Sequence, residues 1–260
     1  MNNNYKKIAR VLIGATIIAL QPAFVYAQDA PAADQVEPAA KPSAFSSSAT
    51  VSLITDYRFR GISLNNGRQA VQGSITVKHE SGLYVTAWGS PFSAIEGDSS
   101  EIAIYGGYQR KIGGVGFDVG AVGYLFPGDD DINFFELYGS ASKSFGPLSS
   151  SVGIYYAPKQ DSGSVRRVSG RTGDSVYVYG SGALAIPKTP VTLSAQIGYE
   201  RGARILSEGG KVDWDLGISV RAIGLNWAVH YIDSDAPTVR SFTGNNITRG
   251  AAVASISKSF

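Results

Sequence analysis

The chain has 260 residues, among them 14 Tyr, 11 Phe and 31 Gly, and it contains no cysteine. The lack of cysteine excludes disulfide bonds, thiolate metal sites and a cysteine nucleophile. Many aromatic and glycine residues, without a long apolar run beyond the N-terminus, favour β structure over helical membrane spans. Basic and acidic residues number 23 and 21, so the net charge gives no reason to expect a nucleic-acid partner.

The first 27 residues are predicted to be a cleaved signal peptide. Three basic residues precede the apolar segment 11–20, which is too short to cross a bilayer as a helix. Small residues at Val25 and Ala27 predict cleavage before Gln28. The mature chain then has a formal charge of −1, because the signal peptide carries three basic residues and no acidic one. Residues 28–45 are rich in Pro and Ala and are predicted to be a disordered periplasmic tail.

Residues 46–260 are predicted to form one all-β domain, an antiparallel up-and-down transmembrane β-barrel of about 12 strands. Several segments, such as 191–200, alternate apolar and polar residues with the period of a β-strand. The breaks between segments alternate strictly between long and short, which is typical of barrels with external loops and short periplasmic turns. The long breaks are residues 61–69, 91–100, 127–131, 157–174, 201–211 and 234–246. The short breaks are residues 80–82, 112–114, 145–147, 186–190 and 222–224.

The alternation alone fits two kinds of protein. In a soluble sandwich the apolar face is the core, whereas in an outer-membrane barrel it meets lipid and the charged face lines the lumen. The signal peptide, the order of the breaks and the aromatic residues near strand ends favour the membrane barrel. Segments 83–90 and 175–185 stay ambiguous, because both of their faces carry aromatic or apolar residues. The aromatic residues predicted to form interfacial girdles are Tyr57, Phe59, Tyr124, Phe126, Tyr155, Tyr156, Tyr199 and Tyr231.

The last predicted strand, residues 247–260, ends on Phe260. A terminal aromatic residue resembles the signal that the barrel-assembly machinery reads, so we expect this machinery to be a partner. Lys258 departs from that pattern, since its position is usually apolar, and its side chain could snorkel to the periplasmic interface.

Short motifs along the mature chain are similar to those of one protein family. The most specific is TDYRFRGIS at residues 55–63. Further matching stretches are QG at 72–73, SGLY at 81–84, AWGS at 87–90, GYLFPG at 123–128, FELY at 135–138 and DWDLG at 213–217. From about residue 46 to the end, the chain resembles the TorF-type porins, also called the Gcw_chp family of proteobacterial proteins. Gln69-Ala70 stands where we expect a Pro-Ala pair. The resemblance implies an outer-membrane barrel described as a porin, and it implies no particular solute.

Charged residues at polar positions of the strands are the candidate pore lining. Asp56, Arg58 and Arg60 share the parity of the first predicted strand, so all three are expected to face the lumen near the external mouth. They form either a constriction that sets ion preference or a salt-bridge network that braces the strand. The complete set of predicted pore-lining residues is Asp56, Arg58, Arg60, Lys78, Glu101, Asp118, Glu136, Glu200, Asp213, Asp215 and Arg221. Its excess of acidic groups favours a mild preference for cations.

Other candidate sites are weaker. His230 has polar parity, and a hydrolase would need a serine beside it and a third group to orient it, so a lumenal hydrogen-bonding role is favoured. His79 has lipid parity near a periplasmic turn, which suits interfacial packing. Two histidines without cysteine argue against a metal site, and neither a nucleophile elbow nor a phosphate loop is present. Arg166, Arg167 and Arg171 either contact lipopolysaccharide phosphates or an anionic solute, or are merely solvated, and the last is favoured.

The sequence therefore predicts a passive channel of the cell outer membrane for small hydrophilic solutes, without enzyme activity or cofactor. A barrel of this size lies between filled eight-stranded barrels and open porins. The alternative is a non-conducting structural or loop-binding barrel, and a lipid-hydrolysing enzyme is a third hypothesis. The expected partners are outer-membrane lipid and lipopolysaccharide, the assembly machinery and small solutes.

Overall fold

The computed structural model describes residues 43–92, 99–128, 132–162, 173–203, 209–241 and 243–260. The predicted signal peptide with its cut before Gln28, nearly all of the predicted tail, and the arginines at 166, 167 and 171 lie outside the described residues. Within the described ranges, no helix has the length and apolar character needed to cross a membrane.

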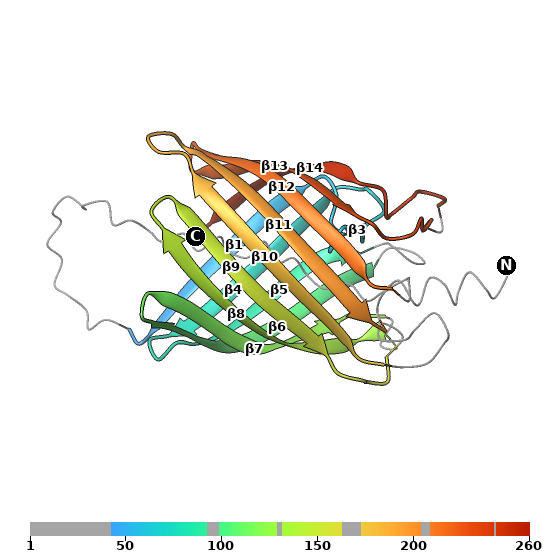
Figure 1. Ribbon diagram of the computed structural model, residues 1–260, viewed down its shortest axis with the longest axis horizontal. Coiled ribbons are helices and arrows are strands. Elements are labelled where there is room, and N and C mark those ends of the chain that lie inside the picture. The colour runs from blue at the N-terminus through green and yellow to red at the C-terminus, as the bar shows by residue number, and fades with distance from the viewer. Residues whose placement is uncertain (1–42, 93–98, 129–131, 163–172, 204–208, 242) are drawn as a thin grey trace, which may run out of the picture.

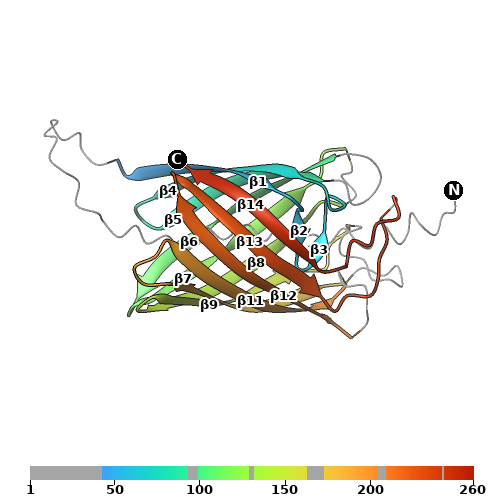
Figure 2. The same ribbon diagram turned by 90° about the horizontal axis from the view of Figure 1, so that it is seen from above.

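Twelve strands form a closed antiparallel barrel, as the sequence predicted (Figure 1; Figure 2). Each strand pairs with the barrel strands before and after it in sequence, and β1 pairs with β14 to close the wall. Two short strands, β2 (Arg58–Phe59) and β3 (Ile62–Ser63), pair with each other. The barrel strands are β1 (Phe45–Ile54), β4 (Ala70–His79), β5 (Leu83–Phe92), β6 (Ser99–Ile112), β7 (Val115–Leu125), β8 (Phe134–Phe145), β9 (Leu148–Ala157), β10 (Ser175–Ala185), β11 (Val191–Gly202), β12 (Lys211–Ala222), β13 (Leu225–Ser234) and β14 (Ala251–Ser259).

The connections alternate in length as predicted (Figure 1). Only two residues separate β6 from β7, β8 from β9, and β12 from β13, whereas residues 55–69 join β1 to β4 and residues 235–250 join β13 to β14. Positive φ angles at Ile223 and Gly224 give the turn between β12 and β13 the twist that tight hairpins require. The short turns lie at one end of the barrel, together with the C-terminus, and the strand ends that the long connections join lie at the other (Figure 1).

The outer surface of the wall is apolar. Large aliphatic side chains such as Val71 and Ile75 on β4 and Leu216 on β12 are exposed. Their neighbours Gln72 on β4 and Asp215 on β12 lie at the alternate positions, which face the interior. An exterior of this kind is suited to lipid hydrocarbon, and a polar interior is suited to water.

The first strand is shorter than the sequence predicted. β1 ends at Ile54, and the segment after it turns into the barrel instead of continuing the wall (Figure 2). The prediction that Arg58 and Arg60 belong to the first wall strand is therefore wrong. Local backbone geometry explains the difference: Arg60 and Gly61 both have positive φ angles, 41° and 87°, which fold β2 back onto β3 in a tight two-residue turn. We call residues 55–69 the inner hairpin.

The girdle prediction is wrong for five of the eight aromatic residues. Tyr57, Phe59, Tyr124 and Phe126 are fully buried in a core inside the long-connection end of the barrel, and Tyr155 packs against that core. The inner hairpin brings its own apolar residues into the lumen, so the facing wall positions are apolar too. The remaining three, Tyr156, Tyr199 and Tyr231, are exposed on the outer face and fit the predicted role.

Tyrosine rings line one side of the interior, and glycines on adjacent strands make room for them. An ideal Cβ at Gly153 on β9 would lie 2.4 Å from the ring of Tyr179 on β10. A Cβ at Gly198 on β11 would lie 2.1 Å from the hydroxyl oxygen of Tyr177. The rings therefore lie flat against the wall instead of projecting to the barrel axis, which preserves lumenal space. This arrangement explains why both faces of β10 carry aromatic or apolar residues: its inward face holds these tyrosines, and its outward face carries the apolar residues of the exterior.

Candidate functional site

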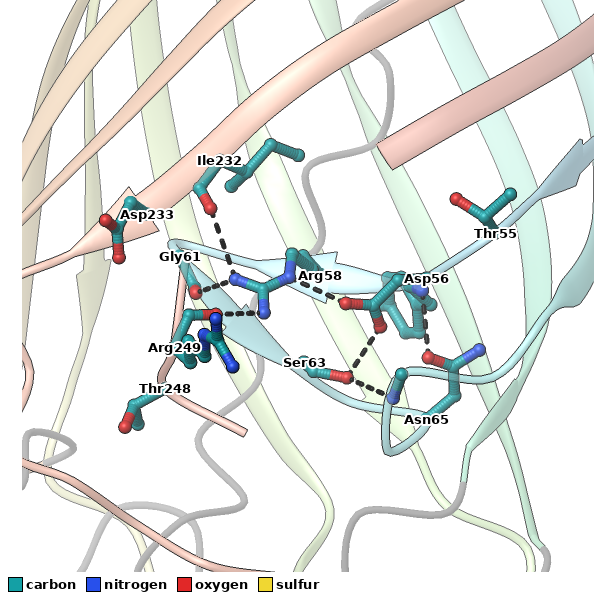
Figure 3. Close-up of polar contacts among 12 residues, drawn as sticks. Thr55, Asp56, Arg58, Gly61, Ser63, Asn65, Ile232, Asp233, Thr248 and Arg249 are labelled. Carbon is teal, nitrogen blue, oxygen red and sulfur yellow. Dashed lines mark hydrogen bonds and ion pairs between the residues drawn. The ribbon is translucent and has the colours of Figure 1, made fainter. Parts of the chain in front are cut away.

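The inner hairpin is built by its own polar residues. The Asn65 Oδ1 atom accepts a hydrogen bond of 2.9 Å from the Tyr57 backbone N–H, and the Leu64 N–H donates to the Tyr57 carbonyl at 2.7 Å. Ser63 Oγ donates to Asp56 Oδ1 at 2.6 Å and accepts from the Gly67 N–H at 2.9 Å (Figure 3). Side chains thus satisfy backbone groups that strand pairing would satisfy elsewhere.

Arg58 ties the hairpin to the wall beside β13. Its Nε atom lies 2.7 Å from Asp56 Oδ2, and its Nη1 atom donates to the carbonyls of Gly61 at 2.8 Å and Ile232 at 3.3 Å (Figure 3). Its Nη2 atom donates to the Arg249 carbonyl in the connection before β14. The guanidinium therefore joins a carboxylate and a carbonyl of the hairpin itself to a carbonyl of β13 and another in the connection before β14.

Arg60, at the tip of the turn, reaches the opposite part of the wall. Its Nη1 atom lies 2.6 Å from Glu200 Oε1 on β11, and its Nη2 atom lies 3.3 Å from Glu136 Oε2 on β8. Lys211 on β12 donates to the Arg60 carbonyl at 2.5 Å and to Asp213 at 3.1 Å. Burial lowers the pKa of Arg60, but the charges of Glu136 and Glu200 raise it by more, so the guanidinium stays charged.

Tyr57 attaches the hairpin to a third part of the wall. Its hydroxyl donates to Glu101 Oε2 on β6 at 3.2 Å, and its ring lies 5.5 Å from that of Trp88 on β5. Burial, reinforced by the charge of Glu101, raises the pKa of Tyr57 well above its ordinary value, so the hydroxyl remains a donor. Through Tyr57, Arg58 and Arg60 the hairpin contacts strands around the whole barrel, and it therefore crosses the lumen.

A second polar cluster lies nearer the short-turn end. Asp118 on β7 accepts hydrogen bonds from the Tyr84 hydroxyl at 2.9 Å and from Gln109 Nε2 at 3.1 Å. Lys78 Nζ donates to Gln109 Oε1 at 2.8 Å, and the hydroxyls of Tyr84 and Tyr138 are hydrogen-bonded to each other. These groups make the lumenal surface polar between the inner hairpin and the short-turn end.

His230 on β13 lies on the lumenal face, as its parity predicted. Its Nδ1 atom is 2.6 Å from Asp215 Oδ1 on the neighbouring strand β12. Ser194 lies on the far side of Gly217 from β13, and no hydrogen bond joins it to His230 among the contacts of the described residues. The His230–Asp215 pair therefore fits a lumenal hydrogen bond better than a serine hydrolase site, which also needs a serine hydroxyl bonded to the histidine.

The structure brings most of the predicted pore-lining residues together in two groups. The long-connection end holds Asp56, Arg58, Arg60, Glu101, Glu136, Glu200 and Asp213, all buried. Lys78, Asp118 and Asp215 lie in the lumen nearer the short-turn end than this first group, and Arg221 is exposed at the short-turn end of β12. Their role in lining a conducting pore stays a prediction. Sequence reasoning missed Lys211, which was placed in a loop, although it is the first residue of β12 and has the parity of Asp213.

Residues 38–260 match the model of one protein family, described as a bacterial protein of unknown function (Gcw_chp). The chain belongs to the Gcw_chp family. No curated protein is significantly similar to it in sequence. Among solved structures, this Gcw_chp protein is similar to the KdgM porin at 9% identity with a TM-score of 0.54. It is also similar to the NanC porin at 10% identity with a TM-score of 0.55. Both matches cover 82% of this chain and 98% of the other, and at such identities they establish the fold of the Gcw_chp barrel alone.

Proposed function

We propose that this Gcw_chp protein is a porin, a passive channel for small hydrophilic solutes with the inner hairpin as its constriction. The observation that carries the proposal is a closed twelve-stranded wall, apolar outside and polar inside, with a charged hairpin held across one end. Charged groups at a narrow point set which solutes and ions pass. The TorF-type label suggested by the sequence motifs agrees with this function.

The proposed location is the outer membrane, reached after cleavage of the signal peptide before Gln28. The exposed apolar wall and the likeness in fold to the KdgM and NanC porins support it. The short turns would face the periplasm and the long connections the cell exterior, the orientation of bacterial barrels. Insertion would depend on the assembly machinery and Phe260, which is exposed beyond β14 and exchanges backbone hydrogen bonds with Ala49.

A second candidate function is a non-conducting barrel that acts through its external connections. The observation that favours it is the tethering of the inner hairpin by Tyr57, Arg58 and Arg60 to strands on all sides of the lumen. A plug fixed at so many points would stop solutes unless part of it moves.

Catalysis is not part of the proposed function. A lipid hydrolase needs its serine and histidine where an acyl ester can reach them. His230 faces the lumen and not the lipid, and among the contacts of the described residues its partner is the Asp215 carboxylate at Nδ1, without the serine hydroxyl that a hydrolase also needs.

Ion conductance in planar lipid bilayers tests the proposal. The purified full chain should give discrete conductance steps, and a variant in which one glycine replaces residues 57–67 should give larger steps because its constriction is gone. Protein unfolded by heat before addition is the control. Steps absent from both proteins would contradict the channel and favour the non-conducting barrel.

A further inference from the structure

The guanidinium of Arg60 occupies a pocket that the barrel wall supplies. Two carboxylates, Glu136 on β8 and Glu200 on β11, contact its two terminal nitrogens at 3.3 and 2.6 Å. The guanidinium carbon lies 3.8 Å from the ring centre of Tyr177 and 5.5 Å from that of Tyr155. We call these four wall residues the guanidinium pocket.

The chemistry of the guanidinium pocket matches a planar cation. Tyrosine faces attract a cation through the ring quadrupole, and a flat guanidinium can stack on a ring while its edge donates to carboxylates. Tyr124 donates to Glu136 Oε2 at 3.1 Å, which fixes that carboxylate in place. Both carboxylates have almost no exposed surface, at 1% and 3%, and Lys211 Nζ also lies 3.8 Å from Glu200 Oε2, so the paired carboxylates favour a second positive charge in the pocket.

Arg60, which supplies the positive charge to the pocket, is a residue type that is unfavourable at this backbone position. Arg60 is the first central residue of a two-residue turn in which both φ angles are positive, where Asn, Asp and Gly are preferred. A non-glycine residue at positive φ is strained, because its Cβ crowds the backbone. The hairpin strands are only two residues long, too short for independent stability, so side-chain contacts hold the tip in place. The Arg60 contacts thus offset the cost of the turn.

We propose that the guanidinium pocket is a solute-binding site for guanidinium compounds: Arg60 fills it while the channel is narrowed, and such solutes widen the channel by replacing Arg60. This inference rests on the proposed channel function and names the class of solute that the channel admits. Lys211 separately holds the Arg60 carbonyl at 2.5 Å, so replacement of the guanidinium frees the Arg60 side chain from the β8 and β11 side of the lumen while the backbone of the tip stays near β12. A tethered group acts as if present at millimolar concentration, so free solutes compete at roughly 1–100 mM.

The test uses the full chain and the substitution Arg60→Asn. Asn-Gly is the favoured pair for this turn, so the variant keeps the turn and removes the guanidinium. Lys188→Asn is the matched control, since Lys188 also has a positive φ, 64°, in an exposed turn at the other end of the barrel. Methylguanidinium chloride is the probe, methylammonium chloride tests charge without the plane, and methylurea tests the plane without charge.

Two measurements are made on each protein: the melting temperature of the folded barrel and its bilayer conductance at fixed ionic strength. Arg60→Asn should melt below the wild type, and methylguanidinium should restore at least half of the loss. The same effect should require a concentration of methylammonium about tenfold higher, because this cation interacts more weakly with the tyrosine rings and with the paired carboxylates. Methylurea should do nothing. Lys188→Asn keeps Arg60 in the pocket, so its melting temperature should respond to none of the three and its conductance should match that of the wild type in each.

A melting temperature of Arg60→Asn that does not rise, or rises equally with all three compounds, would overturn the proposal. If this variant does not fold, the wild type decides: methylguanidinium should raise its conductance above that in methylammonium, and equal conductance would overturn the proposal. Selective stabilisation without current in any protein would overturn the channel but keep the binding site. Current without selective stabilisation would keep the channel and overturn the site.

Discussion

Replacing Arg58 with methionine should detach the inner hairpin from the β13 side of the wall. The side chains of Arg58 and Asp56 are only 3% and 9% exposed, so the substitution leaves a carboxylate buried without its cation. Breaking a buried pair in this way costs about 3–5 kcal/mol. Ser63 still donates to Asp56 at 2.6 Å, which offsets about 1 kcal/mol. We therefore expect a loss of about 3 kcal/mol in the free energy of unfolding.

The measurement is equilibrium unfolding in urea, with the barrel in lipid vesicles and tryptophan fluorescence as the signal. Arg110→Met, an exposed arginine near the short-turn end, is the control and should change stability by less than about 0.5 kcal/mol. The double variant Asp56→Asn with Arg58→Met removes the stranded charge and should be about 2 kcal/mol more stable than Arg58→Met alone. A single variant as stable as the wild type, or a double variant less stable than the single, would refute the reasoning.

Three further results are expected. A cysteine at Lys159, in the connection after β9, should react with an impermeant reagent on intact cells, whereas one at Ile223, which is 85% exposed in a short turn, should react only after the outer membrane is opened; the reverse pattern would invert the topology. Deletion of Phe260 should leave the protein in the periplasm for degradation, and normal outer-membrane levels would show that the terminal aromatic is not read. Gly153→Ala should lower stability by about 1–3 kcal/mol, because the new methyl group meets the Tyr179 ring at 2.4 and 2.6 Å; adding Tyr179→Leu should restore most of that loss, and no recovery would argue that the glycine is needed for another reason.

The wall was predictable because its signals are local. Period-two alternation, as in β11 and β12, and turn residues such as Gly113 and Gly146 depend on a few neighbouring positions. Their order in the chain was enough to predict the strand number and the two ends of the barrel. The loop lengths carried as much information as the strands, because an up-and-down barrel has its short turns at one end.

The inner hairpin was not predictable from the same signals. Asp56, Arg58 and Arg60 alternate with Tyr57 and Phe59 in the same way in a two-stranded hairpin as in a wall strand, so parity cannot distinguish the two. The turn that separates them depends on a positive φ at Arg60, and arginine gives little warning of that conformation. The aromatic partners of the hairpin were assigned to the lipid face for a related reason, since a ring near a strand end suits a membrane interface and a packed lumen equally well.

The inner hairpin also dictates an order of assembly. Its contacts join residues far apart in sequence: Arg60 and Glu200 are 140 positions apart, and Arg58 and Arg249 are 191 apart. Contacts of this separation form late, because the intervening chain must be organised first. While the sheet is still open, the arginines and glutamates stay hydrated and unpaired, and the N-terminal strand is free to wait for its C-terminal partner. Docking of the hairpin therefore requires a closed wall, so the step that completes the barrel is also the one that narrows its lumen.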